Sequence, residues 1–533
     1  MLIDSGISPP TPPDVQSAYD VVVVGGAFSG SALALLLKRA RPKTNILIVE
    51  KSQVFDRKVG ESTSEVSGCF LTRVLGLSNY LACHQFQKHG LRMWFNGEGN
   101  TEAGRCTEIG PFAQARLPTY QLDRSKLDEH LLETCRAEGI DVLRPATIKS
   151  IETGGAGNNT ITLKHDGQTH ALRAGWVADC SGKAAVLARS RGTWRALDAH
   201  PVHSMWVRFR NVRCLDSTEA IRLAPQLGEQ RTAAARGSAT NHLMGRGWWS
   251  WIIPLSNGDF SAGVTWDERL FTPPQDGPVG LRVKQHLLTH PIGKLMFEDA
   301  EPCEKDSRIY KHLPYHSTEV AGDGWVIAGD AAGFMDPLYS QGLDYCSHST
   351  YCAHKLLIKA LDATACIDTA VATHNRQFTE SYERWFHGIY RNKYQYLGDA
   401  ELMRAAFLMD IAAYFVGPVR LVYQFTDAEF SKMPYDGAIG AFFGKFMSHY
   451  NHRLETIARK RIHAGTYGKR NLDHRYFIRR PFEPSPKSFR HLFDGIRAWA
   501  KLELTSAFHK PAPALAQPAP TPIPKARNHP QHA

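Results

Sequence analysis

Residues 21–30 decide the fold, and they read VVVVGGAFSG. Four consecutive β-branched residues bounded by glycines are typical of a strand buried inside a parallel sheet. Residues 31–40 then predict a helix, and residues 46–50 predict a second short apolar strand. The sequence therefore predicts a strand–turn–helix–strand unit at the start of an α/β domain.

The turn of this unit predicts a dinucleotide site. Gly25 and Gly30 allow the backbone to approach a pyrophosphate. Ala27 and Ser29 complete the turn, and the N-terminus of the following helix favours an anion. Glu50, at the end of the second strand, is placed to accept hydrogen bonds from an adenosine ribose. The middle glycine of the usual GxGxxG pattern is Ala27 here, and the surrounding order of elements compensates for this departure.

Hydrophobic patterning divides the rest of the chain. Alternating stretches over residues 202–265 predict a mostly antiparallel sheet, whereas residues 374–508 show helical periodicity. A late apolar strand over residues 325–329 is expected to return to the first domain. The expected division is a flexible leader over 1–18, a dinucleotide-binding domain over 19–195 plus 322–373, a substrate-side β domain over 196–321, a helical C-terminal domain over 374–508 and a disordered Pro/Ala/His tail over 509–533.

The composition is that of a soluble globular enzyme, with 43% hydrophobic and 22% charged residues among 533. The formal net charge of +11 comes from dispersed basic residues, which argues against nucleic-acid binding. It is compatible with an acidic carrier protein or a phosphate-bearing cofactor as the anionic partner. Residues 1–20 show no signal-peptide pattern. Ten scattered cysteines without a CxxC pair favour reduced thiols in the cytoplasm.

Two further patterns are expected to be structural only. The apolar stretch over residues 405–425 contains Asp410, Pro418 and Arg420, so it predicts a buried helix pair rather than a transmembrane span. Two cysteines and two histidines fall within residues 346–354 on a predicted helix. Their spacing directs the side chains to different sides, and we expect no metal site there.

A tryptophan-rich strand is the most distinctive motif. Residues 249–254 read WSWIIP, and this alternation predicts a strand with Trp249, Trp251 and Ile253 on one face, followed by Pro254. Taken alone, the pattern indicates only a core strand. Four other segments accompany it: GEST at 60–63, FQKHGLR at 86–92, GDAAG at 329–333 and FMDPLYSQG at 334–342.

Together these segments resemble the flavin-dependent halogenases, a family in the FAD-binding aromatic-hydroxylase superfamily, over residues 18–500. The resemblance is nearest the branch that halogenates pyrroles and phenols. It implies a Rossmann-type FAD-binding domain with an inserted antiparallel β substrate domain and a helical C-terminal region. Arg124 would lie at a helix start beside the cofactor, Asp330 would meet the ribityl chain, and Gly342 would start the helix that faces the flavin ring. The alternative for Arg124 is a solvated arginine next to a helix cap at Asp123.

The resemblance also implies the chemistry. Reduced FAD, O2 and chloride or bromide would form a flavin hydroperoxide and then hypohalous acid, with the halide on the backbone amides of Gln341 and Gly342. Lys88 would hold this oxidant by hydrogen bonding or react with it to a haloamine. The tryptophan strand would be a wall that keeps the substrate off the flavin, and a separate flavin reductase would supply FADH2. On its own pattern, Lys88 is an ordinary surface lysine beside Arg92.

One position departs from the tryptophan-halogenating members of the family. They carry a glutamate before the serine of the PLxS element, whereas this chain has Tyr339. The departure favours a small aromatic substrate activated by its own hydroxyl or pyrrole nitrogen, free or tethered to an acyl or peptidyl carrier protein. The alternative is a base from elsewhere in the chain.

Three other functions stay open at this point. An aromatic hydroxylase that uses NAD(P)H shares the FAD domain, although the chain shows no second glycine-rich fingerprint. A geranylgeranyl-reductase-like flavoprotein shares the GEST segment but lacks the tryptophan signature. A halogenase-derived scaffold without turnover would keep the same motifs.

Overall fold

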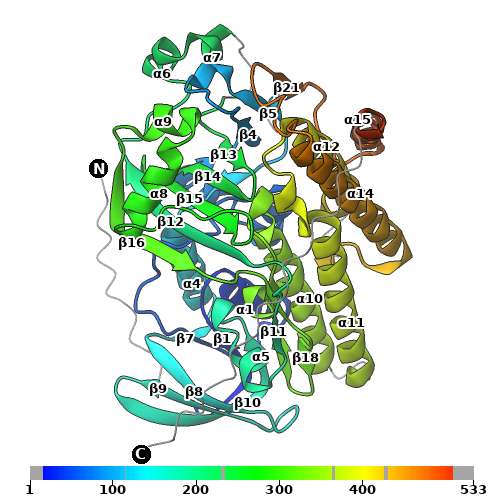
Figure 1. Ribbon diagram of the computed structural model, residues 1–533. Helices are drawn as coiled ribbons and strands as arrows, with labels where there is room; N and C mark the ends of the chain where they lie inside the picture. Colours follow the sequence, from blue (N-terminus) through cyan, green and yellow to red (C-terminus); the bar gives the residue numbers. More distant parts are fainter. Residues whose placement is uncertain (1–15, 114–115, 230–234, 363–365, 425–429, 508–533) are drawn as a thin grey trace, which may run out of the picture.

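The computed structural model describes residues 16–113, 116–229, 235–362, 366–424 and 430–507. Figure 1 shows a mainly parallel sheet in the lower half, a second β-sheet above it, and long C-terminal helices along one side of both. Residues 1–15 of the predicted leader and the whole predicted tail lie outside the described residues.

The first sheet is centred on β1 (Ala18–Val24), which pairs in parallel with β2 and β10. Its strand order is β18-β19-β10-β1-β2-β7, and β8 and β9 extend it beside β10. The strands are β2 (Ile46–Val49), β7 (Asp141–Leu143), β8 (Ala146–Glu152), β9 (Asn159–His165), β10 (Gln168–Asp179), β18 (Ala321–Gly322) and β19 (Trp325–Ile327). The parallel α/β sheet predicted from residues 21–50 is confirmed, and β19 brings the late strand back to it.

Three helices pack together beside this sheet. They are α1 (Phe28–Ala40), α4 (Arg124–Ala137) and α10 (Gly342–Asp362), and α1 contacts both of the others. The interior of this layer is largely aliphatic, with residues 21–24 of β1 and all of β2 almost fully buried. A segment near residue 30 and one near residue 342 therefore begin neighbouring helices.

The second sheet is mostly antiparallel and has the order β16-β12-β15-β14-β13-β4-β5-β21. Its strands are β4 (Leu91–Phe95), β5 (Thr107–Pro111), β12 (Val202–Arg210), β13 (Thr240–Gly245), β14 (Trp248–Pro254), β15 (Phe260–Asp267), β16 (Glu301–Tyr310) and β21 (Arg475–Ile478). Three of these lie outside the expected β domain of 196–321. Strand β4 pairs with the edge of β13, and β5 and β21 extend the sheet from β4. Without β4, the backbone N–H and C=O groups on this edge of β13 would have no partners in the sheet.

Two small sheets and several short helices complete the two β-containing regions. The small sheets pair β3 (Phe86–Gln87) with β6 (Tyr120–Gln121), and β11 (Trp194–Ala196) with β17 (Tyr315–Ser317) and β20 (Gly333–Phe334). The short helices are α2 (Glu65–Cys69), α3 (Ser78–His84), α5 (Val186–Ser190), α6 (Thr218–Leu223), α7 (Pro225–Glu229), α8 (Val279–Leu288) and α9 (Pro291–Phe297).

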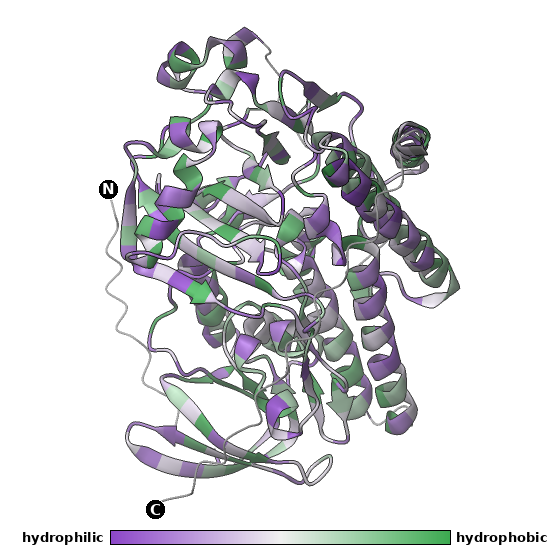
Figure 2. Ribbon diagram, in the orientation of Figure 1, coloured by the Kyte–Doolittle hydropathy of each residue, from purple (hydrophilic) through white to green (hydrophobic). Residues whose placement is uncertain are grey.

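The C-terminal region is helical, as predicted. Its helices are α11 (Ile367–Trp385), α12 (Ala400–Tyr414), α13 (Arg420–Gln424), α14 (Gly437–His463) and α15 (Phe489–Ala507). In Figure 2 the long helices carry both hydrophobic and hydrophilic residues, as helices with one buried face do.

The expected helix pair over 405–425 is wrong. Helix α12 continues into α13 through a π-helical turn, Phe415–Val419, which accommodates Pro418 without breaking the run. The run Ala400–Tyr423 is long and apolar enough to cross a membrane, but 72% of its apolar window is buried inside the structure. This burial is that of a core helix.

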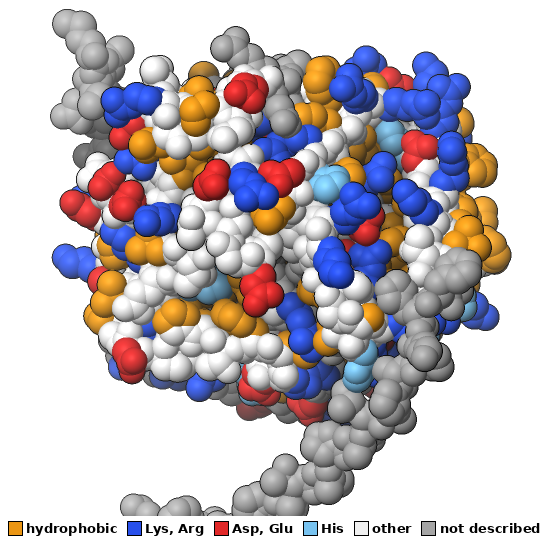
Figure 3. Space-filling view, turned by 45° about the horizontal axis from the view of Figure 1, so that its top comes forward, with side chains coloured by type: hydrophobic (Ala, Val, Ile, Leu, Met, Phe, Trp, Pro, Cys, Tyr) orange, Lys and Arg blue, Asp and Glu red, His pale blue; other side chains and the backbone are white. Residues whose placement is uncertain are grey.

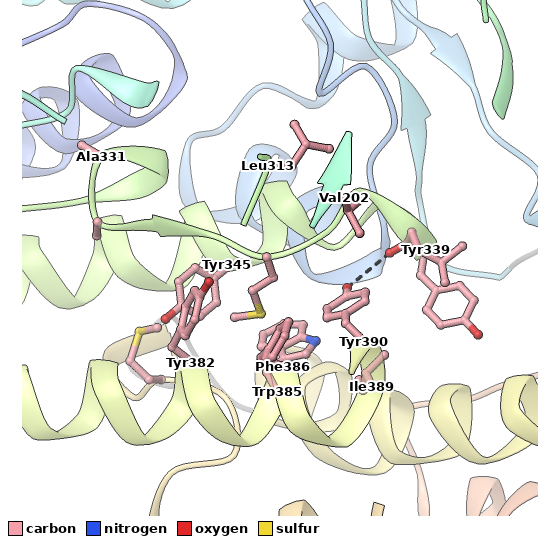
Figure 4. Close-up of a cluster of buried hydrophobic side chains, with 14 of the residues drawn as sticks. Val202, Leu313, Ala331, Tyr339, Tyr345, Tyr382, Trp385, Phe386, Ile389 and Tyr390 are labelled. Carbon is pink, nitrogen blue, oxygen red and sulfur yellow. Dashed lines mark hydrogen bonds between the residues drawn. The ribbon is translucent and has the colours of Figure 1, made fainter. Parts of the chain in front are cut away.

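The aromatic face of α11 packs against the segment that precedes α10. Figure 4 shows Tyr382, Trp385, Phe386 and Tyr390 from the α11 run beside Tyr345 and the residues before it. All five side chains are buried. The helical C-terminal region thus supports the loop that carries the FMDPLYSQG motif.

Candidate active site

The dinucleotide turn has the geometry that a close-approaching ligand requires. Gly25 adopts a left-handed φ of 96°, and a Cβ on Gly30 would lie 1.8 Å from the carbonyl oxygen of Gly25. Helix α1 begins after Ala27 with no side-chain cap and no acidic residue in its first turn. Its first N–H groups are therefore free of competing side chains and favour an anion such as a pyrophosphate.

Glu50 lies against this turn. Its carboxylate accepts hydrogen bonds from the backbone N–H groups of Gly26 and Ser52, both at 2.8 Å. A carboxylate has further lone pairs, so it can also accept ribose hydroxyls. A Cβ on Gly329 would lie 2.2 Å from Ser29 Oγ, so the late GDAAG segment meets the first turn.

The first cavity has an empty volume of about 1070 Å³ and brings together sequence-distant residues. It is lined by three of the predicted cofactor residues, namely Arg124, Asp330 and Gly342. Arg124 is 7% exposed and donates to Asp128 at 3.1 Å, so the alternative of a solvated arginine is wrong. The adjacent Asp123 does cap α4, through the N–H of Ser125.

Asp330 is the acidic group of this cavity. It follows β19 and accepts a hydrogen bond from Cys346 Sγ at 3.3 Å. Burial raises its pKa from the ordinary value, and the nearby Arg124 guanidinium opposes that shift. The Cys346 thiol donates to Asp330, so it does not form a metal site with the other Cys and His side chains of α10. Among the described residues, no group of three or more His, Cys, Asp or Glu side chains is arranged to hold a metal ion.

The tryptophan strand is β14, and it faces the same first cavity. Trp249, Trp251 and Ile253 all line it, as their shared face predicts. The indole N–H of Trp249 donates to Tyr394 Oη at 3.0 Å, which fixes the ring. Pro254 ends β14 and pairs with Phe260.

Lys88 lies in a second cavity, with an empty volume of about 1040 Å³. The residue follows β3 and is 5% exposed, so the alternative of a surface lysine is wrong. Its Nζ donates to Ser62 Oγ at 2.8 Å and to the carbonyl oxygen of Thr63 at 2.7 Å. Burial lowers the Lys88 pKa to about 8, against the opposing effect of Glu65 and Asp344.

Two segments form the partition between the cavities. Glu61 and Ser62 line the first cavity, whereas Ser64 and Glu65 line the second. In the other segment, Ser340 and Gly342 line the first cavity, whereas Tyr339 and Gln341 line the second. A hydrogen bond from the Ser64 hydroxyl to the Ser340 carbonyl, at 3.2 Å, joins them. Trp249 and Trp251 line only the first cavity, so the segments that line both cavities are these two rather than the tryptophan strand.

The segment 338–342 has an unusual backbone. Tyr339 and Ser340 both have left-handed φ values, 69° and 62°, and Gln341 returns to the right-handed region. Such a change of hand directs successive N–H groups to one side and makes an anion-binding concavity. The Gln341 side-chain oxygen accepts from Trp385 at 2.8 Å and from Tyr390 at 3.0 Å, so α11 holds the segment in place.

A family model described as Tryptophan halogenase matches residues 20–106 and 105–394, which is most of the chain. The chain belongs to the tryptophan halogenase family. The predicted family resemblance is thereby confirmed.

Curated proteins that are similar to this chain are named as halogenases or chlorinases. Flavin-dependent halogenase chlA of Dictyostelium discoideum is 26% identical over 389 residues, which cover 64% of this chain and 60% of the relative. The chain therefore aligns with less than two thirds of that protein. The 1H-pyrrole-2-carbonyl-(peptidyl-carrier protein) chlorinase of Pseudomonas fluorescens is 24% identical, with 70% of this chain and 80% of the relative covered. These relatives agree with the family that the family model shows.

Solved structures agree in fold. Halogenase PltM in complex with phloroglucinol and FAD superposes with a TM-score of 0.69 at 17% identity, covering 91% of this chain and 96% of that chain. Flavin-dependent brominase Bmp2 gives a TM-score of 0.59 at 20% identity, covering 82% and 100%. The predicted fold class is confirmed.

The family motifs did not reveal every group at the second cavity of this halogenase-family chain. Tyr339 Oη donates to Asp410 at 2.9 Å, and Lys393 forms an ion pair with the same carboxylate. Lys393 and Asp410 come from the helical C-terminal region, where no motif marks them. Glu65 directly follows the GEST–Ser64 segment, and its position beside a motif was the only signal that could have indicated it.

Proposed function

We propose that this protein is an FADH2-dependent halogenase that uses O2 and chloride or bromide to halogenate an electron-rich phenol or pyrrole. One observation carries the proposal: a buried lysine ammonium lies in its own cavity, separated by a partition from the cavity that contains the cofactor motifs. A hydroxylase needs no second compartment, because its oxidant passes directly from flavin to substrate.

The dinucleotide turn and the residues of the first cavity together fit FAD. The close contact of Gly25 and Gly30 leaves room for a pyrophosphate, and Glu50 is placed for the ribose. Arg124, Asp330 and the other residues that line the cavity would surround the ring system and ribityl chain. Bound FADH2 would supply, with O2 and a halide, the hypohalous acid that the rest of the site uses.

The backbone before α10 is suited to the halide. The N–H groups of Gln341 and Gly342 follow the change of hand at Ser340 and begin a helix, so they can donate to a small anion. Ser340 and Gly342 line the first cavity. The halide would thus be held where the oxidant forms.

Lys88 would hold the hypohalous acid in the second cavity by hydrogen bonding from its ammonium. A pKa of about 8 leaves the ammonium as the main form at neutral pH. The substrate ring would lie against the apolar side chains of this cavity, including Phe407, Ile411 and Phe415. Lys88 would then orient an electrophilic halogen toward the ring.

Tyr339 is not free to act as a base. Its hydroxyl is committed to Asp410, and burial raises its pKa well above the ordinary value. This supports a substrate that is activated by its own hydroxyl or pyrrole N–H.

A basic surface supports an acidic carrier protein as the source of the substrate. Two adjoining grooves beside β21, α12 and α15 are lined, among the described residues, by ten basic and two acidic side chains. The basic ones are Arg404, Lys460, Arg461, Lys469, Arg470, Arg475, Arg479, Arg480, Arg497 and Lys501. Figure 3 shows Lys and Arg side chains gathered on one side of this view.

The first of these grooves leads to the lysine cavity. It shares Phe407, Ile478 and Arg480 with that cavity. Three of the ten basic side chains are paired with carboxylates of this chain, namely Arg461, Arg475 and Arg480. One small anion needs few cations, whereas the seven others match a polyanionic protein surface, and the junction would admit a flexible arm that carries the ring. Replacing Arg497 and Lys501 together by glutamate should raise KM for a carrier-bound substrate at least tenfold and leave KM for the free ring unchanged. Equal effects on both substrates would contradict a carrier.

The remaining partners are also proposals. A separate flavin reductase would supply FADH2, because the sequence contains a single glycine-rich dinucleotide fingerprint. Cytoplasmic location is supported by ten free cysteines, which persist in a reducing compartment.

The deciding experiment supplies FAD, a flavin reductase with NADH, bromide and a panel of phenols and pyrroles. Wild-type protein should form brominated product, and Lys88→Ala should form none above the level of free hypobromous acid. Lys126→Ala is the matched control, because Lys126 is exposed on α4 and should not affect product formation. Product that persists unchanged in Lys88→Ala would refute the role of the lysine. Hydroxylated product with direct NADPH oxidation would identify an aromatic hydroxylase instead.

A further inference from the structure

Two carboxylates line the lysine cavity among the described residues: Glu65 and Asp410. Halogenation of a phenol or pyrrole releases a proton, and a buried cavity needs an acceptor for it. The two carboxylates differ in what surrounds them, and this difference identifies the acceptor.

Asp410 is already neutralised. It forms a buried ion pair with Lys393 and accepts the Tyr339 hydroxyl at 2.9 Å. Lys393 itself is fully buried, so loss of the negative charge on Asp410 would leave an unpaired buried cation. Protonation of Asp410 during turnover would therefore be costly.

Glu65 has no such partner. Among the described residues it forms no ion pair within 4.0 Å, although Lys88 is close enough to act on its charge. Burial raises the pKa of Glu65 from the ordinary value, and the Lys88 ammonium and the nearby Tyr414 hydroxyl oppose this shift. A carboxylate with a raised pKa is a stronger base at neutral pH.

The fold does not need the Glu65 carboxylate to hold α2. Val66 N–H donates to Tyr414 Oη at 3.1 Å, and Ser67 N–H donates to Asp344 at 2.8 Å. These contacts already satisfy the first N–H groups of α2, and Ser64 N–H donates to the Ser67 hydroxyl at 3.2 Å. The side chain of Glu65 is therefore available to the cavity.

We infer that Glu65 is the general base of the aromatic substitution and that the substrate is a ring with an ionisable O–H or N–H. The inference rests on the proposed function. Glu65 and Lys88 line the same cavity, so a ring bound there would be within reach of both the proposed holder of the oxidant and the base.

The step balances as follows. The ring gives a π electron pair to the halogen while the halogen–oxygen bond breaks, and Glu65 takes the O–H or N–H proton of the ring. The hydroxide released from hypohalous acid takes this proton from Glu65 and leaves as water. The hydrogen on the halogenated carbon then moves to the ring oxygen or nitrogen, and aromaticity returns. Arene and hypohalous acid have become haloarene and water.

The test compares Glu65→Gln, Glu65→Asp and wild type with bromide, FAD and a flavin reductase. Two phenols are used at one pH: one that is neutral and a more acidic one that is already ionised. For the neutral phenol, Glu65→Gln should lower kcat by about 100-fold or more, since general-base catalysis contributes at least this factor. For the ionised phenol it should lower kcat by less than tenfold, because no proton remains to be taken. Glu65→Asp should restore part of the activity on the neutral phenol.

FAD fluorescence titration of each variant checks that the first cavity is intact. An equal loss of kcat on both phenols would show that Glu65 only supports the structure, and an unchanged kcat on both would show that it takes no part. Either result overturns the inference while the halogenase function stands. Absence of halogenated product from wild type with every ring would instead refute the proposed function.

Discussion

The buried ammonium of Lys88 should cost the protein stability, and Lys88→Met should therefore stabilise the apo-protein at neutral pH. The pKa of Lys88 falls from 10.5 to about 8. A shift of about 2.5 units corresponds to a penalty of about 3 kcal/mol on the charged form in the folded state. Methionine removes this penalty but also the hydrogen bonds to Ser62 and Thr63, which are worth about 1 kcal/mol each. The net gain at pH 7 should be about 1 kcal/mol.

The sign of this difference should reverse at high pH. Below pH 8 Lys88 is protonated in both states, so the folded state bears the full penalty. Between about pH 8 and 10.5 the unfolded chain holds a proton that the folded chain has lost, so wild-type stability rises with pH through this group. Lys88→Met lacks this rise. Above this window the variant should be the less stable protein by the two lost hydrogen bonds, about 2 kcal/mol.

Urea unfolding followed by tryptophan fluorescence measures both proteins at pH 7 and at pH 10. All other titrating groups are common to the pair, so the difference in unfolding free energy reports Lys88 alone. A variant that is less stable at pH 7, with a difference that does not change with pH, would refute the reasoning. The same pKa predicts that product formation falls about tenfold from pH 7 to pH 9 as the ammonium is lost. Lys88→Arg, if active, should lack this fall.

Three other substitutions test separate parts of the fold. Asp410→Asn should lower the free energy of unfolding by about 3–5 kcal/mol, because it leaves the buried Lys393 charge unpaired. Adding Lys393→Met should recover most of this loss, as measured by urea unfolding. No recovery would contradict the ion-pair explanation. Gly30→Ala should abolish FAD binding in a fluorescence titration, since its Cβ would clash with the Gly25 carbonyl; wild-type affinity would show that the turn can relax. Trp249→Phe should lower the free energy of unfolding by about 1–3 kcal/mol, because the buried Tyr394 hydroxyl loses the indole N–H that donates to it. A melting temperature equal to that of wild type would show that this hydrogen bond does not stabilise the fold.

The parts of the fold that follow from local pattern could be predicted from the sequence. The β1–α1–β2 unit is encoded by adjacent residues, because four β-branched residues precede a glycine turn and an apolar helix. The strand of Trp249 is likewise a period-two pattern, and its three inward residues line one cavity. Long-range pairing was less accessible. No local signal indicates that β21 pairs with β5, more than 360 residues earlier.

The burial of Lys88 could not be derived from its neighbours in sequence. The segment FQKHGLR is polar, and its burial arises because β3 pairs with β6 and Lys88 N–H donates to the carbonyl of Thr119. Only the family resemblance singled out this lysine. Lys393 and Asp410 were missed for a similar reason, because a charged pair inside a helical region becomes a cavity wall only after α12 packs under the segment of Tyr339.

The partition, rather than the substrate, orients the lysine. Ser62 lines the first cavity, accepts the Lys88 ammonium at 2.8 Å and exchanges a hydrogen bond with Thr240 at 3.1 Å. The Thr240 hydroxyl also accepts from Gln121 at 2.9 Å, so the serine is held from its far side. Two of the three ammonium hydrogens therefore point at the partition, and the tetrahedral nitrogen must direct the third away from it. A donor fixed in this way would need no reorganisation to bind the proposed oxidant, and a preorganised hydrogen bond of this kind contributes most to a reaction.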